Sequence, residues 1–139
     1  MNAVDTNILI YSLDAGEAIK QGKALALLGQ LQAESVPCHL LWQVLSETIN
    51  QLSRWRNQRA ITDVEFHEHV QAIRGLFPIL LPTVKTRDSA LVLSLHYNLS
   101  HWDSMILGAC REARINTLYT EDMGAPRMID GIELINPFI

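Results

Sequence analysis

Four acidic side chains, Asp5, Glu47, Asp103 and Asp122, are spread along this 139-residue sequence, and together they are able to support metal-dependent chemistry. Two carboxylates ~5 Å apart repel by about 3 kcal/mol at an effective dielectric of about 20. Acids gathered in one pocket therefore require a bound cation or raised pKa values. The set contains no His or Cys, so its ligands are all oxygens, which suit Mg²⁺ or Mn²⁺ rather than zinc. Such ions also bind water and phosphate oxygens, so the set favours phosphoryl chemistry.

Each of these acids also has an ordinary structural explanation. Asp5 suits the N-cap of a helix that begins near residue 8. Asp103 is the N3 partner of Ser100 in a Ser-x-x-Asp cap, although it faces the apolar stripe of its helix. Asp122 suits a solvated loop, and Glu47 lies outside the centre of the apolar stripe on its own helix. The metal-site hypothesis therefore depends on the four acids converging.

Strands alternate with helices along the chain, and this order predicts where the acids lie. A short strand over residues 2–5 ends in Asp5, and another over residues 117–120 comes just before Asp122, which places both acids at carboxyl ends of strands. Alternating elements indicate an α/β fold with a mostly parallel sheet, whose ligand site is at that edge. Beyond a first helix near residue 8, the expected helices are 20–32, 40–54, 62–75 (opened by a Thr62-x-x-Glu65 capping box), 86–97 and 102–114, and the other expected strands are 35–38, 78–82 and 131–135.

Composition limits the class of protein. Apolar residues make up 48% and charged residues 19%, which is typical of one folded domain spanning residues 1–139. No apolar run approaches the ~20 residues of a membrane span. Cys38 and Cys110 show no zinc pattern, and the five histidines are scattered, so we expect a reduced cytoplasmic protein without a His-based metal site. Trp42 and Trp102 are expected to be packing residues, with the alternative that Trp102, which adjoins Asp103, fixes the approach of that acid.

The net charge of −4 means that any attraction for nucleic acid must be local. The densest basic and aromatic stretch contains Arg54, Trp55, Arg56 and Arg59. Such residues contact phosphates and stack on bases, so this stretch is a candidate contact for RNA. It is equally explained as the solvated, positively charged end of a helix, or as a contact for a protein partner.

Five short motifs, in this order, resemble PIN domains, and the likeness is greatest to VapC-type toxins. The motifs are Val4-Asp5-Thr6-Asn7-Ile8-Leu9, Ser46-Glu47, Leu99-Ser100-His101-Trp102-Asp103-Ser104-Met105-Ile106, Leu118-Tyr119-Thr120-Glu121-Asp122-Met123 and Asn136-Pro137-Phe138. The resemblance covers essentially the whole chain. It implies a single PIN-like domain with a sheet of about five strands flanked by helices.

The resemblance also implies a function. In that family the four acids that correspond to Asp5, Glu47, Asp103 and Asp122 hold Mg²⁺ or Mn²⁺ and cut RNA. It further implies that nearby residues orient ligands or water, namely Thr6, Asn7, Ser46, Thr120 and Glu121. The expected partners are an RNA substrate, an inhibiting antitoxin whose tail enters the acidic groove, and a second copy of the chain in a homodimer.

Two rival functions remain open. The first is another acidic-site phosphoryl-transfer enzyme, although a haloacid-dehalogenase-like phosphatase requires a second Asp two residues after Asp5, where Asn7 stands. A phospho-receiver requires an adjacent acidic pair near the first strand, which is also missing. The second rival is a catalytically silent RNA- or protein-binding domain, against which the intact set of four acids argues.

Overall fold

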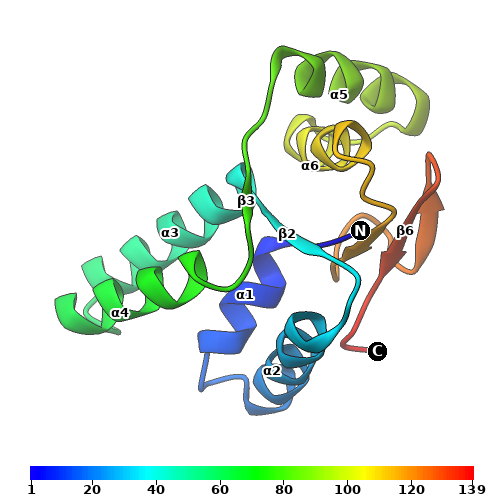
Figure 1. Cartoon of the computed structure of the whole chain (residues 1–139). Helices are drawn as coiled ribbons and strands as arrows, with labels where there is room; N and C mark the ends of the chain where they lie inside the picture. Colours follow the sequence, from blue (N-terminus) through cyan, green and yellow to red (C-terminus); the bar gives the residue numbers. More distant parts are fainter.

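The computed structural model describes all 139 residues as one six-stranded sheet with six helices (Figure 1). The elements are β1 (Asn2–Val4), α1 (Thr6–Leu13), α2 (Ala18–Ala33), β2 (Cys38–Leu41), α3 (Trp42–Asn57), α4 (Asp63–Arg74), β3 (Ile79–Leu80), α5 (Val84–Tyr97), α6 (His101–Glu112), β4 (Thr117–Tyr119), β5 (Arg127–Ile129) and β6 (Ile132–Ile135). The predicted α/β fold is confirmed.

The strands run in the order β3-β2-β1-β4-β6-β5, and all pairs are parallel except β5 with β6. β1 and β4 are neighbours, with Val4 opposite Tyr119. The residues that follow these two strands, Asp5 and Thr120, therefore leave the sheet side by side. Because α3 begins at Trp42, directly after β2, it rises from the same edge.

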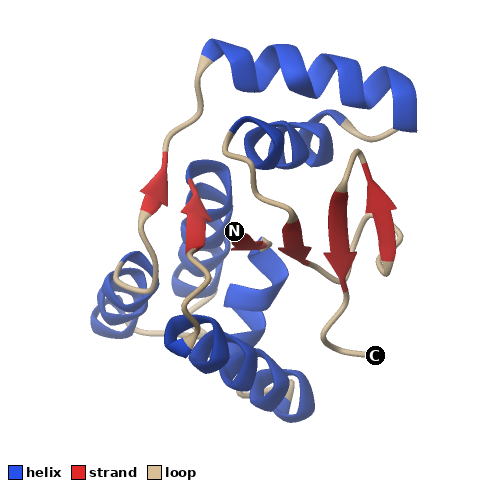
Figure 2. Ribbon diagram, turned by 45° about the vertical axis from the view of Figure 1, so that its right-hand side comes forward, coloured by secondary structure: helices blue, strands red, loops and turns tan.

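The helices pack in pairs around the strands. α5 and α6 lie together on one side of the sheet, and α1 and α2 lie on the opposite side (Figures 1 and 2). The α3–α4 pair projects away from the sheet as an arm (Figure 1). A cluster of 24 buried apolar residues between these layers forms the core. None of the six helices has the length and apolarity that crossing a bilayer requires.

Local sequence signals explain where α4 and α6 begin. The predicted capping box is present, because the Thr62 hydroxyl accepts from the Glu65 N–H and the Glu65 carboxylate accepts from the Thr62 N–H, both over 3.1 Å. At α6 the Ser100 hydroxyl accepts from the Asp103 N–H over 3.2 Å. These bonds satisfy backbone donors that have no partner within the helix.

Three predicted features of the elements are wrong. Residues 35–37 are not a strand, since β2 begins at Cys38, and α3 begins at Trp42 instead of at residue 40. The Gly- and Pro-containing segment after Asp122 was expected to be a loop but includes a strand, β5, which brings the sheet of about five expected strands to six. The boundary between β2 and α3 was misplaced because β2 is buried on both faces. A strand of this kind appears in the sequence as a continuous apolar run, which is not distinguishable from the start of the apolar helix that follows it.

Candidate active site

Thr120 connects two of the predicted site acids at the edge of the sheet. Its buried hydroxyl donates to Asp5 Oδ2 over 2.8 Å and accepts from the Asp122 N–H over 3.0 Å. Asp5 is also the N-cap of α1, because its Oδ1 accepts from the Thr6 N–H over 2.7 Å. The ordinary role expected for Asp5 therefore coexists with a place at the centre of the site.

Glu47 reaches the same edge from the second turn of α3. One of its oxygens, Oε2, accepts from the Thr6 hydroxyl over 2.8 Å. The other, Oε1, accepts from the Gln43 amide over 2.8 Å, and that amide also donates to the Trp102 carbonyl over 3.1 Å. Glu47 is therefore a half-buried acid held on both oxygens, and not a freely solvated residue on the flank of a helix.

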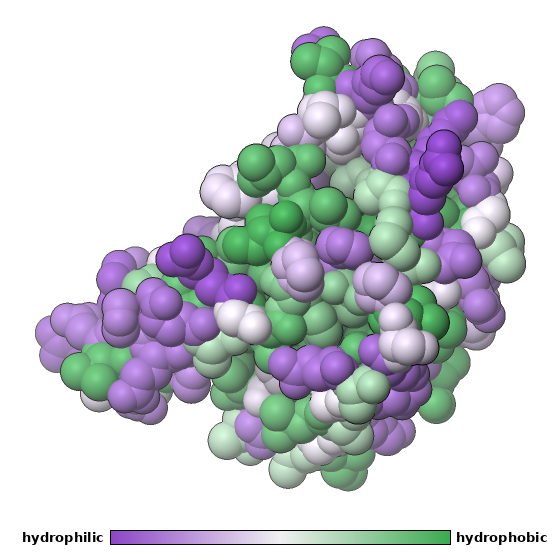
Figure 3. Space-filling model, in the orientation of Figure 1, coloured by the Kyte–Doolittle hydropathy of each residue, from purple (hydrophilic) through white to green (hydrophobic).

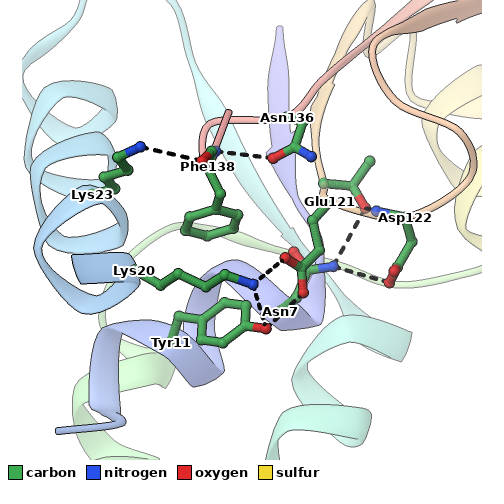
Figure 4. A network of polar contacts seen from close by, with 9 residues as sticks. Asn7, Tyr11, Lys20, Lys23, Glu121, Asp122, Asn136 and Phe138 are labelled. Carbon is green, nitrogen blue, oxygen red and sulfur yellow. Dashed lines mark hydrogen bonds and ion pairs between the residues drawn. The ribbon is translucent and has the colours of Figure 1, made fainter. Parts of the chain in front are cut away.

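Asp122 is exposed and is held by Asn7. The Asn7 Nδ2 donates to Asp122 Oδ2 over 3.0 Å and approaches Thr120 Oγ1 at 3.5 Å (Figure 4). The Asn7 Oδ1 is buried and has no hydrogen-bond partner. An acceptor left without a partner in this way is unfavourable unless a ligand or a water molecule satisfies it.

Electrostatic coupling joins all four acids. Burial raises the pKa of Asp5 from its ordinary value of 3.8 to about 6, against hydrogen bonds from Thr120 and Thr6 that lower it, and the charges of Asp122 and Glu47 raise it further. Burial also raises the pKa of Asp103, although a hydrogen bond with Ser100 lowers it, and the same two charges, on Asp122 and Glu47, add to the rise. The negative charges of Glu47 and Asp122 therefore raise the pKa values of both Asp5 and Asp103.

The thiol behind the acids is inert. Burial, and then the charge of Asp5, raises the pKa of Cys110 to about 12, so this residue is a neutral thiol at physiological pH. Thiolate is the reactive form of cysteine. Cys110 therefore contributes packing and no nucleophile.

As the chain stands, no three His, Cys, Asp or Glu side chains lie close enough together to form a metal-binding group. Neutral donors from Thr6, Asn7, Gln43 and Thr120 instead bind three of the carboxylates, those of Glu47, Asp122 and Asp5. The donor set nevertheless fits a hard divalent ion. All its ligands are oxygens, Asp5 is buried without a salt bridge to any basic residue, and the Asn7 Oδ1 has no partner.

A groove of about 400 Å³ is open at two of the acids, Glu47 and Asp122. It is lined by Thr6, Asn7, Ile10, Tyr11, Glu47, Asn50, Gln51, Arg54 and Asp122. Arg54 is exposed and forms no salt bridge, so it is a free cation on the wall of an acidic groove.

The other members of the basic stretch lie elsewhere. Trp55 lines a separate pocket with Asp14 and His69. The Arg56 guanidinium stacks 4.5 Å from the centre of the Phe66 ring on α4, and Arg59 is exposed beyond the end of α3. Of the four residues suggested for RNA contact, only Arg54 lines the groove with the acids.

Of the five residues expected to orient ligands or water, three contact the acids and two do not. Asn7 hydrogen-bonds one of the four acids, and Thr6 and Thr120 each hydrogen-bond two. Ser46 is exposed and makes no side-chain hydrogen bond, and Glu121 binds Lys20 and Tyr11 instead of the acids.

Three residues that contact the site or its loop were missed. Gln43 is one helical turn before Glu47, a spacing that favours side-chain pairing and gave a usable signal. Lys20 and Tyr11 had no such signal, because their partner, Glu121, is more than 100 positions away.

The prediction that Trp42 and Trp102 are packing residues is wrong, since 48% and 64% of their surfaces are exposed. Both line an apolar groove of about 270 Å³ whose other walls include Leu80, Met105 and Ile106. Figure 3 shows hydrophobic residues gathering between the arm and the α5–α6 pair. Trp102 also lines a second pocket with Glu47, whose other lining residues are Gln43, Ser46 and Asn50, so the apolar groove adjoins this acid.

The chain belongs to the PIN domain family, because the family model matches residues 3–129. This confirms the family resemblance read from the motifs. A sequence comparison with curated proteins finds no match.

Solved structures agree with this fold. A toxin–antitoxin complex from Klebsiella pneumoniae matches with a TM-score of 0.69 and 18% identity over 99% of this chain and 98% of that one. Mycobacterium tuberculosis VapC20, described as a toxin that cleaves the sarcin-ricin loop, matches with a TM-score of 0.68 and 20% identity over 89% and 92%. Rickettsia felis VapBC2 bound to promoter DNA matches with a TM-score of 0.70 and 14% identity over 96% of each chain. At these identities the likeness establishes the shared fold.

Proposed function

We propose that this chain is a Mg²⁺- or Mn²⁺-dependent endoribonuclease and the toxin of a type II toxin–antitoxin pair. The observation that carries the proposal is the network of hydrogen bonds from Thr6, Asn7 and Thr120, which joins Asp5, Glu47 and Asp122 at one edge of the sheet. The charges of Glu47 and Asp122 also act on Asp103. Membership of the PIN family and the similarity to VapC20, a toxin that cleaves RNA, support the choice of RNA as substrate.

In this proposal Asp5 and Asp103 are the principal ligands, and Glu47 and Asp122 complete or orient a second cation or its waters. A bound divalent ion lowers the pKa of a water molecule and neutralises charge on the phosphate. Water then adds to phosphorus and the bond to the 3′ oxygen breaks, which leaves a 5′-phosphate and a 3′-hydroxyl. No side-chain nucleophile is needed, in agreement with the neutral thiol of Cys110.

The residues around the acids have defined tasks. Thr6 and Gln43 hold Glu47, Thr120 holds Asp5, and Asn7 holds Asp122, so three of the four carboxylates are oriented before substrate arrives. Such orientation by neighbouring hydrogen bonds is typical of metal sites. Arg54 supplies a positive charge for a phosphate next to the scissile one.

An antitoxin partner and a homodimer are part of the proposal. Two of the similar structures are toxin–antitoxin assemblies that match 96% or more of this chain. The exposed apolar groove at Trp42 and Trp102 adjoins the acids, so an apolar antitoxin segment bound there would cover the site. Co-expression with the product of a short reading frame directly upstream should give a stable complex without nuclease activity.

The nuclease proposal is tested by incubating purified protein with a structured RNA, with Mn²⁺, with Mg²⁺ and with a chelator. We expect cleavage only with the divalent ions, fragments with 5′-phosphates, and at least a hundredfold loss in Asp103→Asn. RNA binding without cleavage would favour a silent binding domain, and acid-stable phosphoprotein would favour another phosphoryl-transfer enzyme.

A further inference from the structure

Three side chains from different elements form a closed ring of hydrogen bonds next to Asp122 (Figure 4). Lys20 of α2 donates to Glu121 Oε2 over 2.9 Å and to the Tyr11 hydroxyl oxygen over 3.1 Å. The Tyr11 hydroxyl of α1 in turn donates to Glu121 Oε1 over 2.8 Å. Both oxygens of Glu121 are therefore bound by side chains of α1 and α2.

The end of the chain covers this ring. Phe138 packs edge-on against Tyr11 with 5.1 Å between ring centres, and the Lys20 ammonium lies 4.5 Å from the Tyr11 ring centre and 5.6 Å from that of Phe138. Phe138 is itself fixed, since its N–H donates to the Asn136 side chain and its carbonyl accepts from Lys23. Lys20 is thus held by two hydrogen bonds and two aromatic rings.

Asp122 needs support from outside its own loop. Its side chain is exposed and held by a single hydrogen bond, from Asn7. The next two residues, Met123 and Gly124, have φ of 56° and 74°, so the loop has no regular structure to stiffen it. Glu121, the residue before Asp122, is anchored more firmly, because Tyr11 of α1 and Lys20 of α2 both bind its carboxylate.

Lys20 also neutralises the negative charge of Glu121. Glu121 adjoins a site that already holds four acids, and a fifth free carboxylate there would add repulsion. Paired with Lys20, Glu121 is neutralised and turned away from the groove, whose lining includes Tyr11 but neither Lys20 nor Glu121.

We propose that Lys20 is a positioning residue that, through Tyr11 and Glu121, fixes the 120–122 loop and so places Asp122 in the acidic site. The consequence for cleavage rests on the proposed nuclease function, but the effect on the loop does not. A direct contact between Lys20 and RNA is the competing role, and it would change affinity for RNA instead of the loop.

The test compares Lys20→Met with Lys85→Met, which removes the same charge from an exposed position at the start of α5, outside the ring and its Phe138 cover. The first readout is hydrogen exchange of the Asp122 and Ala125 amides in metal-free protein, because these amides bond within the loop. We expect exchange in Lys20→Met to be faster on the order of fivefold to tenfold, and unchanged in Lys85→Met. Mn²⁺ affinity should fall several-fold in the same variant.

Steady-state cleavage then separates positioning from RNA contact. A positioning role predicts a lower kcat with KM within about twofold of wild type. Exchanging the pair, with Lys20→Glu and Glu121→Lys together, should restore most of the loop protection and kcat. A raised KM with unchanged exchange would overturn the proposal and assign Lys20 to RNA binding.

Tyr11→Phe tests the same ring if Lys20→Met fails to fold, because it removes only the hydroxyl and keeps the packing with Phe138. Wild-type exchange in this variant and in Glu121→Gln would overturn the proposal. If wild-type protein cuts no RNA while Lys20→Met still loosens the loop and weakens Mn²⁺ binding, the nuclease function is wrong and the positioning role stands.

Discussion

Thr120 donates its hydroxyl hydrogen to Asp5 over 2.8 Å, although the two residues are 115 positions apart. The bond forms because β1 and β4 are parallel neighbours, so the residues that follow them emerge together. The same hydroxyl accepts from the Asp122 N–H. One buried side chain therefore fixes two of the four acids.

Thr120→Val tests this role, since valine has a similar shape but no hydroxyl. The change leaves a buried carboxylate oxygen and a backbone N–H without this partner, so the free energy of unfolding should fall by about 1–3 kcal/mol. The pKa of Asp5 should rise further, because the lost bond is one that lowers it. Denaturant titration at pH 7 measures the first effect. Thr120→Ser, which keeps the hydroxyl, should remain close to wild type, and equal loss in both variants would contradict the argument.

Asp5→Asn should stabilise the metal-free protein at neutral pH. The folded pKa of about 6 lies above the ordinary 3.8, so the folded chain binds more protons between these values and its stability falls as pH rises through them. At pH 7 the ionised Asp5 costs about 3 kcal/mol, partly offset in the variant by weaker hydrogen bonds. We expect a Tm several degrees higher at pH 7 that converges with wild type near pH 4, measured by thermal melts. A lower Tm at pH 7 would contradict the argument that burial of the ionised Asp5 destabilises the folded protein.

Gly108 should tolerate no side chain, because a Cβ there would lie 2.7 Å from the Thr86 carbonyl oxygen and 3.0 Å from the Ala90 nitrogen. These backbone atoms belong to α5, which packs closely on α6. Gly108→Ala should therefore lower the free energy of unfolding by about 1–3 kcal/mol. Gly29 of α2 has nothing within 4 Å, so Gly29→Ala should instead stabilise by about 0.5–1 kcal/mol. Chemical denaturation of both variants checks the opposite signs, and a stabilised Gly108→Ala would refute the close approach.

Arg54→Ala should weaken RNA binding without affecting stability. Arg54 lines the acidic groove and is not engaged in a salt bridge, so its loss should raise KM and reduce the salt dependence of binding by about one phosphate contact. Arg59→Ala is the matched control, because that side chain is exposed and does not line the groove. Equal effects of the two changes in a salt titration would mean that attraction is diffuse.

Local signals predicted much of the fold. The Thr62–Glu65 capping box placed the start of α4, and apolar periodicity located the other helices to within a few residues. β5 was missed although Asp130-Gly131, with φ of 51° and 76°, is a turn pair typical of a hairpin, because the strand is short and two of its three residues are exposed. The signal was present, and the Gly and Pro residues before it suggested a loop.

For the site, the sequence indicated the candidate acids but not the residues that bind them. Residue type and strand ends identified the acids, and the family resemblance identified Glu47, which helical position alone disfavoured. The hydrogen-bond partners depend on long-range packing. Lys20 meets Glu121 across 101 positions, and no spacing in the sequence indicates that contact. Trp102 is exposed beside the acids because α6 begins at the surface, which apolar character alone cannot reveal.

The central claim is that the four carboxylates bind one class of hard cation together. Titration of Mn²⁺ into metal-free protein, followed by calorimetry or by the electron spin resonance of the free ion, measures this without any RNA. We expect binding in wild type that weakens about tenfold for each pH unit below about 6, as Asp5 takes up a proton. Asp5→Asn and Asp103→Asn should abolish it, Glu47→Gln and Asp122→Asn should weaken it, and Asp88→Asn, an exposed acid of α5, should not change it. Wild-type Mn²⁺ affinity in Asp5→Asn or Asp103→Asn would contradict the account.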